Sequence, residues 1–349
     1  MSMRGFYPHY GAERTCGPVR SSSSRYCLRA LRQVALLLLT FGLPGVVAAG
    51  ELAWITNQTA GTVSVLDLDA LQVIDTVDVP DGPAGVAVTR DGSRVYITHP
   101  DLGLVSEIDA ATRKLVQSIE VGGSPFGIAL DERDRRLLFV TDWSRHILIV
   151  IDPKKGIPLD LLAVGQSPAG IVVDELARRV YIADRESDTV TVLDADVARG
   201  FAQIKVGSHP FGIAFDQAAK RVYVGNVRSG SLSVIDTADL KETAQIPVGE
   251  FPYGIAVGRD GKVYVANQRD DEIAVVDPAT ASVSGRQSVG RYPDGVAINA
   301  AGDRLVVANW FDDSVTVLSL PGLETLARIE VGEGCRAFGQ FIGPAPPVP

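Results

Sequence analysis

Residues 248–254 read Val-Gly-Glu-Phe-Pro-Tyr-Gly, and residues 263–267 read Val-Tyr-Val-Ala-Asn. The same two phrases, a Val-Gly-x-x-Pro-x-Gly turn and a short apolar strand closed by Asn or Asp, recur in seven variants. A constant period near 42 residues, with three or four short strands per unit, is typical of a β-propeller blade. The Asp that closes the next strand recurs in steps of 41 to 43 residues, at Asp67, Asp109, Asp152, Asp194, Asp236 and Asp277, with Ser319 in the seventh copy.

Each repeat divides into four strands. In one copy we expect the innermost strand at Gly212–Phe215, followed by strands at Arg221–Asn226, Leu232–Asp236 and Ala244–Val248. Glycine at the start of the innermost strand allows seven backbones to crowd near one axis. The sequence therefore predicts an all-β, seven-bladed propeller of four-stranded antiparallel blades. The turn glycine keeps its register at Gly85, Gly127, Gly170, Gly212, Gly254 and Gly295, with Ala337 in the seventh position.

The two ends of the array complement each other. The first copy has outer strands at Leu52–Asn57, Thr62–Asp67 and Val73–Val79 but lacks an innermost strand. The C-terminal copy offers one extra strand, Ala337–Ile342. Together they would make one blade, which closes the ring and removes an exposed sheet edge.

Residues 1–49 have the layout of a secretory signal peptide. Arginines precede an apolar run at residues 34–42, and a small-residue exit, Val47-Ala48-Ala49, follows it. We therefore expect cleavage after Ala49 and a periplasmic or secreted protein that is not held in a membrane, with an uncleaved anchor as the alternative. The propeller would span residues 50–343, and residues 344–349 would form a Pro-rich disordered tail.

The charge and cysteine content narrow the function further. The chain carries 33 basic and 42 acidic residues; residues 1–49 hold six Arg and one Glu, so the rest has a net charge of −14. Such a surface repels nucleic acid and anionic membranes. Cys16 and Cys27 lie in the leader, which leaves Cys335 alone, so a disulfide within the mature chain is excluded.

Several fragments resemble the YVTN-repeat family of bacterial β-propellers. They are Val-Tyr-Val-Ala-Asn at 263–267, Arg-Val-Tyr-Val-Gly-Asn at 221–226 and Ser-Val-Ile-Asp-Thr at 233–237. The resemblance implies an exported binding or surface protein, or a protein associated with redox systems such as quinoprotein dehydrogenases. Related seven-bladed folds include lactonases, a lyase and the propeller of haem-d nitrite reductases, so the resemblance specifies fold better than activity.

Candidate binding residues collect on one face, where the inter-blade turns and the ends of the second strands meet. Binding residues gather on loops that a rigid scaffold positions. Asp294 and Arg336, from neighbouring copies, could form an ion pair. A solvated rim with an ordinary surface ion pair remains the alternative. The bulky and ionisable side chains of the last four turns would line one arc of the channel mouth: His209, Phe211, Phe251, Tyr253, Tyr292, Asp294 and Arg336.

The residues after the second strands add two tryptophans to this face. Trp143 and Trp310 are candidate protein contacts, with packing between blades as the alternative. Cys335 replaces the turn proline beside Arg336, a neighbour that could lower a thiol pKa. Cys335 is therefore a candidate reactive thiol, or simply a tolerated small residue.

Three functions remain open from the sequence. The first is a non-catalytic binding or scaffold propeller for a protein partner, such as a periplasmic quinoprotein or cytochrome, or for a small ligand. The second is a subunit of a quinoprotein dehydrogenase system. The third is a lactonase- or lyase-type enzyme, with His209 as acid or base and Asp294 and Asp184 as candidate carboxylates. The three histidines of the mature chain, His99, His146 and His209, lack the spacing of a metal pair. No C-x-x-C-H motif occurs, and we predict no cofactor, metal site or catalytic residue.

Overall fold

The computed structural model describes residues 50–134, 136–196 and 200–346. Contacts divide the chain into residues 1–47 and residues 48–349, and all the described strands belong to the second unit. The predicted signal peptide at residues 1–49 lies outside the described residues. No helix in the described ranges is long and apolar enough to cross a membrane.

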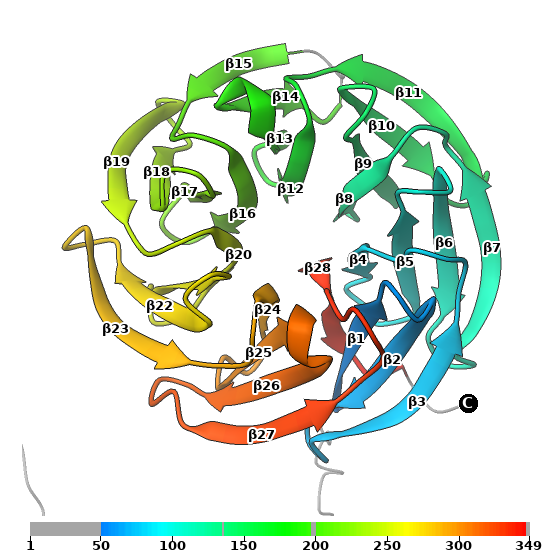
Figure 1. Ribbon diagram of the computed structural model, residues 1–349. Helices are drawn as coiled ribbons and strands as arrows, with labels where there is room; N and C mark the ends of the chain where they lie inside the picture. Colours follow the sequence, from blue (N-terminus) through cyan, green and yellow to red (C-terminus); the bar gives the residue numbers. More distant parts are fainter. Residues whose placement is uncertain (1–49, 135, 197–199, 347–349) are drawn as a thin grey trace, which may run out of the picture. The chain divides into compact units, whose positions relative to one another are not determined.

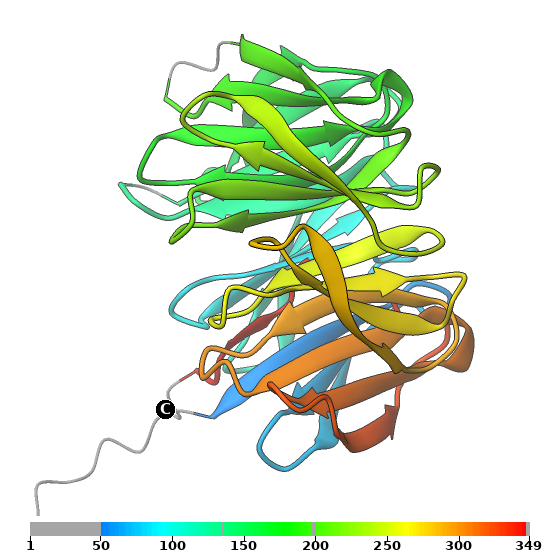
Figure 2. The same cartoon turned by 90° about the vertical axis from the view of Figure 1, so that its left-hand side faces the viewer.

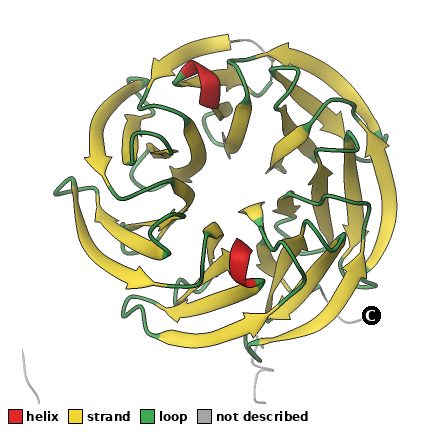
Figure 3. Ribbon diagram, viewed as in Figure 1, coloured by secondary structure: helices red, strands yellow, loops and turns green. Residues whose placement is uncertain are grey.

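The strands form seven sheets around a common axis (Figures 1 and 2). Apart from the two strands that the C-terminus adds, neighbouring strands within each blade run antiparallel and pair in chain order from the axis outwards. The predicted all-β, seven-bladed propeller is therefore confirmed. Within the described ranges the helical segments are two short turns, η1 (Arg185–Ser187) and η2 (Trp310–Asp312), each directly after the second strand of its blade (Figure 3).

The strand bounds follow the repeat closely. The first blade holds β1 (Glu51–Asn57), β2 (Thr62–Asp67) and β3 (Gln72–Asp78), the second β4 (Gly85–Val88), β5 (Arg94–His99), β6 (Leu104–Asp109) and β7 (Lys114–Glu120), and the third β8 (Pro125–Asp131), β9 (Leu137–Asp142), β10 (Ile147–Asp152) and β11 (Ile157–Ala163). The fourth blade holds β12 (Pro168–Asp174), β13 (Arg179–Asp184), β14 (Thr189–Asp194) and β15 (Gly200–Lys205).

The remaining blades repeat this order. The fifth holds β16 (Pro210–Asp216), β17 (Arg221–Asn226), β18 (Ser231–Asp236) and β19 (Lys241–Pro247), and the sixth β20 (Pro252–Val257), β21 (Val263–Asn267), β22 (Glu272–Asp277) and β23 (Ser282–Ser288). The seventh holds β24 (Pro293–Ile298), β25 (Arg304–Asn309), β26 (Ser314–Ser319) and β27 (Thr325–Glu330), and the chain ends in β28 (Phe338–Gln340) and β29 (Ile342–Pro344).

The C-terminal segment closes the ring, but not as one continuous strand. The predicted inner strand Ala337–Ile342 is wrong in detail, because β29 pairs with β1 whereas β28 adds to β4 as a fifth, parallel strand of the second blade. Cys335 bridges Asn57 as Pro210 bridges Asn226, yet Ala53 pairs with Ile342, seven residues further along. The equivalent pair in the fifth blade lies five residues beyond Pro210. Two extra residues therefore bulge toward the axis.

The structure also shortens the predicted tail. Pro344 pairs with Glu51 in the closing sheet, and the Ala345 backbone N–H donates to the Gly50 carbonyl at 2.6 Å. Residues 344 and 345 are thus part of the closure rather than of a disordered tail. Residues 347–349 lie outside the described residues.

The turn glycines are required by close approach of the blades. A Cβ on Gly212 would lie 1.7 Å from the Tyr253 carbonyl oxygen, and one on Gly254 would lie 2.2 Å from the Asp294 carbonyl oxygen. The other four turn glycines also face a carbonyl of the next inter-blade turn: Gly85 that of Phe126, Gly127 that of Ala169, Gly170 that of Phe211, and Gly295 those of Ala337 and Arg336. Any side chain here would force neighbouring inner strands apart.

In every blade but the second, where His99 takes the position, the second strand ends in a buried Asn or Asp that links strands together. The Asn226 amide donates to the hydroxyls of Ser231 and Ser233 at 3.1 and 2.8 Å. Asp184 accepts from Thr191 at 2.6 Å and from the Gly165 backbone N–H at 3.1 Å. These bonds join the second strand to the third strand and to the inter-blade turn. Between the blades, apolar clusters such as that of Tyr181, Val190 and Val222 form the core.

Candidate functional site

The predicted arc lies where the inter-blade turns meet the ends of the second strands, which we call the mouth face. The three predicted arc residues that precede a turn proline adopt a left-handed backbone there, His209 (φ 58°), Phe251 (φ 57°) and Tyr292 (φ 58°), as does Ser167 (φ 51°) in the equivalent turn. Such φ values are uncommon for residues other than glycine. A carboxylate in the preceding blade holds two of these turns: the His209 backbone N–H donates to Asp188 at 2.9 Å and that of Tyr292 to Asp271 at 2.8 Å. The turns are therefore fixed before any ligand arrives.

Six predicted site residues come together in one hollow on this face. It has a volume of about 290 Å³, and its wall also includes Arg185, Val227 and Gln268. We call it the aromatic groove, and its six predicted members are Trp143, Phe211, Phe251, Tyr253, Tyr292 and Trp310. They come from the third, fifth, sixth and seventh blades, so the ring arrangement brings together residues far apart in sequence.

An aromatic layer forms the floor of the groove. The rings of Phe211 and Tyr253 stack with centroids 3.9 Å apart, and Phe338 contacts Phe211 edge-on at 5.2 Å. Phe126 lies 5.3 Å from Phe338 and 5.9 Å from Trp143. Aromatic pairs in these geometries contribute stability beyond area burial. Sequence reasoning did not select Phe126 and Phe338; Phe126 follows a turn proline as Phe211 does, whereas Phe338 reaches the layer only through the two-residue bulge.

Arginine side chains lie against the groove's rings. The Arg269 guanidinium carbon lies 3.6 Å from the Phe251 ring centroid, and that of Arg185 lies 5.7 Å from the Trp143 ring. Both distances are within the range of cation–π attraction. Arg185 also pairs with Glu186. The groove thus presents aromatic surface edged by positive charge.

Asp294 and Arg336 form the predicted pair, but not on a solvated rim. Their side chains are 0 % and 7 % exposed, so the surface-pair interpretation is wrong; the polypeptide covers both groups. Arg336 also donates to the Tyr253 hydroxyl at 2.9 Å and to the Gln58 side-chain oxygen at 3.2 Å. Burial acts against the charge of Arg336, but Asp294 outweighs it, and the pKa of the guanidinium is raised.

This buried pair supports the groove from below. The Arg336 guanidinium lies 4.3 Å from the Trp310 ring centroid, and Gln268 donates to Asp294 at 3.4 Å. Burial raises the pKa of the Tyr253 hydroxyl, which therefore stays neutral. Asp294 and Arg336 consequently position groove residues rather than line the hollow themselves.

His209 lies beside the groove with carboxylates other than the predicted ones. Its Nε2 is 3.6 Å from Glu186 and its Nδ1 is 3.9 Å from Asp188 and 3.0 Å from the Ser208 hydroxyl. Asp184 and Asp294 are both fully buried and have other partners, so the carboxylates suggested for an enzyme do not gather around His209. Burial raises the pKa of Asp184 to about 6.

The other two histidines have local partners. His99 is fully buried, its Nδ1 lies 3.1 Å from the Asp81 carbonyl oxygen, and burial lowers its pKa. His146 Nδ1 accepts from the Ser167 backbone N–H at 2.9 Å. Among the residues that the structure describes, no group of three His, Cys, Asp or Glu side chains could hold a metal ion.

Cys335 is not placed as a reactive thiol. Its side chain is fully buried and donates to the Asn309 carbonyl at 3.1 Å. Burial raises the pKa of the thiol to about 12, with Asp294 acting in the same direction. The neighbouring Arg336 guanidinium is directed to Asp294 instead. This geometry favours the small packed residue over the predicted reactive thiol.

Comparison with known proteins agrees with this architecture. Residues 48–136 match the model of the YNCE-like β-propellers. That match and the seven-bladed fold confirm the predicted YVTN-like bacterial β-propeller. No curated protein matches the chain.

Solved structures share the fold at low sequence identity. Hydrazine synthase of Kuenenia stuttgartiensis is similar with a TM-score of 0.69 at 19 % identity, over 78 % of this chain and 92 % of that one. A functionally unknown protein of Desulfotomaculum acetoxidans gives 0.71 at 16 %, over 81 % and 98 %. The dihydro-haem d1 dehydrogenase NirN, in complex with DHE, gives 0.63 at 17 %, over 81 % and 73 %. These likenesses concern the fold alone.

Proposed function

We propose that this chain is a non-catalytic binding propeller that docks a protein partner on its mouth face, through the aromatic groove. The observation that carries the proposal is the convergence of six aromatic side chains from four blades in one hollow. Tyr, Trp and Arg are the residues most enriched in the energetic centres of protein interfaces. The groove has all three.

The shape of the surface favours a protein over a small molecule. A volume of about 290 Å³ lies at the small end of the range for ligand pockets. The aromatic surface also continues outside the hollow, because Phe311 is 55 % exposed and stacks on Tyr292 with centroids 4.5 Å apart. A partner could therefore bury a wider patch than the groove alone.

Charge suggests the chemistry of the partner side chains. Arg269 is exposed and covers Phe251, and within the described part of the chain it forms no ion pair with a carboxylate. An acidic side chain beside an apolar or aromatic anchor would complement this arrangement. Because the groove is edged by arginines on an otherwise acidic chain, an acidic contact patch on the partner would be attracted to the groove and repelled by the propeller's remaining surface.

We further propose that the protein acts in the periplasm or outside the cell, after removal of residues 1–49. Its partner would then be another exported protein, and a quinoprotein or a cytochrome is the class we favour. The fold likeness to a hydrazine synthase and a dehydrogenase is consistent with a redox association. It is an analogy of fold only.

The test compares capture by three forms of the protein. Wild type, a Phe251→Ala/Tyr292→Ala variant and a Leu159→Ala/Leu161→Ala variant would be immobilised and exposed to exported proteins from the source cell. The two leucines are exposed on β11, the outermost strand of the third blade, and serve as a matched control. We expect one protein to be retained by wild type and control but lost from the groove variant.

The captured protein would then be purified and its dissociation constant measured with each form. Loss of two central aromatic anchors should weaken binding at least tenfold, whereas the control should bind as wild type does. Equal binding by all three forms, or no specific capture by wild type, would contradict the proposal.

A further inference from the structure

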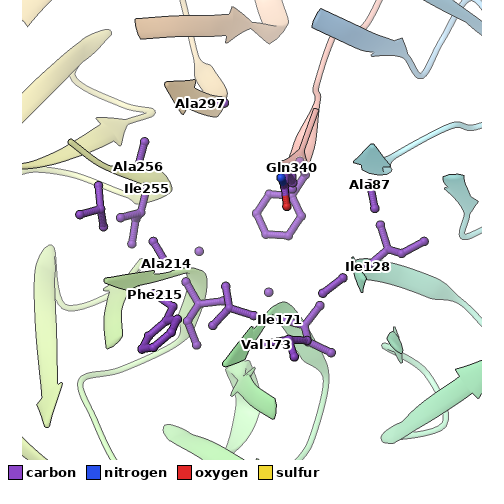
Figure 4. Close-up of a pocket in the computed structure, with 18 of the residues that line it drawn as sticks. Ala87, Ile128, Ile171, Val173, Ala214, Phe215, Ile255, Ala256, Ala297 and Gln340 are labelled. Atoms are coloured by element: carbon purple, nitrogen blue, oxygen red, sulfur yellow. The ribbon is translucent and has the colours of Figure 1, made fainter. Parts of the chain in front are cut away.

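A second, larger cavity lies on the axis of the propeller. It has a volume of about 720 Å³ and shares no lining residue with the aromatic groove. We call it the central channel. Its wall is built mainly from the residues that follow the turn glycines on the inner strands, which are small and apolar. Those labelled in Figure 4 are Ala87, Ile128, Ile171, Val173, Ala214, Phe215, Ile255, Ala256 and Ala297, together with Gln340.

The aromatic layer separates the two cavities. Phe338 lines the central channel, Phe211 lines the aromatic groove, and their rings are in edge-on contact. At its other end the channel is lined by Arg90, Glu175 and Gln217, which follow the ends of inner strands. The channel therefore opens on the face opposite the mouth face.

The C-terminal bulge gives the channel its asymmetry. The parallel pairing of β28 with β4 places Gln340 beside Ala87, at the level of the second residue after the turn glycine. Figure 4 shows Gln340 as the single polar side chain among its labelled residues, and the amide lies within the apolar ring. The Gln340 side chain is exposed to the channel, and its amide forms no hydrogen bond with another described residue. The seven inner strands would otherwise present similar small apolar side chains to the axis, and the Phe338 ring and the Gln340 amide break this repetition.

The charge at the channel opening is already neutralised. Arg90 pairs with Glu175 at 2.5 Å across the second and fourth blades, and the backbone N–H of Glu132 donates to the same Glu175 carboxylate at 2.8 Å. Arg90 and Glu175 are the two ionisable residues among those that line the cavity. A charged ligand would find no counter-ion deeper in the channel, where an unpaired charge is costly.

We propose that the central channel binds a small, uncharged, mainly apolar molecule with one carbonyl or hydroxyl group. The apolar body would pack against Ile171, Ala214 and Ile255, and the polar group would bond the Gln340 amide. Of the channel wall, Val173, Ala214 and Ala297 are only half-buried, so a ligand would remove apolar surface from water. The volume is in the range of established small-molecule sites. This site is independent of the partner surface on the mouth face.

The probe is Nile red, an uncharged dye whose fluorescence rises in apolar surroundings. We expect the wild-type protein to bind it in a 1:1 ratio. Displacement by 2-nonanone and by nonane then isolates the polar contact, because the two have the same carbon number and only the ketone accepts a hydrogen bond. In wild type the ketone should compete roughly three- to tenfold better than the alkane, beyond its greater solubility.

Two substitutions assign the site. Gln340→Leu should retain Nile red binding but remove the solubility-corrected preference for the ketone. Ala214→Phe should fill the channel and reduce Nile red binding at least tenfold; Ala256→Leu is the substitute if that variant does not fold. Phe251→Ala, in the aromatic groove, is the control and should leave both measurements unchanged.

Nile red binding by wild type and by these variants decides whether the central channel is the binding site. The proposal is overturned if wild type does not bind Nile red stoichiometrically. It is also overturned if a folded channel-filling variant binds as wild type does, or if Gln340→Leu keeps the ketone preference. Loss of dye binding in Phe251→Ala alone would place the dye in the aromatic groove and would likewise reject the channel as the site.

Discussion

The Arg336 Nε lies 2.6 Å from Asp294 Oδ2 in a position closed to solvent. The arginine belongs to the C-terminal segment that closes the ring, and the aspartate follows the turn proline of the seventh blade. One buried ion pair thus ties the last segment of the chain to the blade before it. It also holds Tyr253 and contacts Trp310, both residues of the aromatic groove.

Removing one partner of this pair should be strongly destabilising. Arg336→Met leaves Asp294 buried without its cation, and a loss of about 3–5 kcal/mol in the free energy of unfolding is expected. Urea unfolding measures it. The double variant Arg336→Met/Asp294→Leu should recover a large part of the loss, because no buried charge remains. Equal losses in the single and double variants would show that packing, not charge, determines the effect.

Asp184 should make the folded protein less stable as pH rises, which is the opposite of the usual effect of a carboxylate. Burial raises its pKa to about 6 in the folded protein, above the ordinary value of 3.8. Its contribution to stability is therefore fully present below about pH 4 and is lost as pH rises through about 6. Asp184→Asn should remove this loss and raise stability at pH 8 by about 1–3 kcal/mol, with little gain at pH 4. Urea unfolding at both pH values tests the difference.

Asp142 provides the contrasting control, since it occupies the equivalent position in the third blade. Burial opposes its charge, but backbone and side-chain hydrogen bonds from Arg145 outweigh burial and hold the pKa below the ordinary value. Its contribution is present above the unfolded pKa and is lost in acid. Asp142→Asn should therefore destabilise the protein at pH 8. The same sign of change at both sites would contradict this account.

Gly212→Ala should disrupt the packing of two inner strands. The added Cβ would lie 1.7 Å from the Tyr253 carbonyl oxygen, a backbone atom that cannot rotate away. We expect a loss of at least about 2 kcal/mol in thermal or urea unfolding. Gly285→Ala is the control, because its nearest neighbour is 3.8 Å away in Val275, and its effect should stay within about 0.5 kcal/mol.

Loss of the closing strand should open the ring. A chain that ends at Gln340 lacks β29 and the bond from the Trp54 backbone N–H to the Phe341 carbonyl, 2.9 Å long. The edge of β1 would then be unpaired, and unpaired edges associate. We expect a lower melting temperature and oligomers in light scattering. A control chain that ends at Pro346 keeps β29, and its melting temperature and oligomeric state should match those of wild type.

The Cys335 thiol should be inert until the protein unfolds. Its burial and its raised pKa of about 12 leave little thiolate at neutral pH. Iodoacetamide labelling at pH 8, read by mass spectrometry of the Cys335 peptide, should be slow in buffer and rapid in denaturing urea. Rapid labelling of the folded protein would restore the reactive-thiol interpretation.

The repeat predicted the fold well because each blade is a local unit with a fixed period. β13 and β17 begin and end where the pattern placed them, and residues such as Phe251 and Trp310 meet because equivalent positions of a ring share one face. The burial of individual side chains was not predictable in the same way. Whether Asp294 is exposed depends on which side chains cover it, and the pattern of one sequence does not contain that information.

The sequence predicted that the two ends of the chain close the ring, but it did not predict the path of the C-terminal segment. The complementary ends of the array indicated which segments meet, but not the two additional residues that direct Phe338 and Gln340 to the axis. These residues break the repeat, so no equivalent position in another blade could reveal them. They decide both the floor of the aromatic groove and the position of the Gln340 amide in the central channel.

The position of β29 also sets the order of events during biosynthesis. The strand that completes the first blade is translated after all six other blades, so the first blade waits with its inner edge uncovered until translation is nearly finished. A ribosome that stalls just before β29 would release a chain that has all the other blade strands but an open ring. Folding of this propeller is therefore completed only after its last residues leave the ribosome.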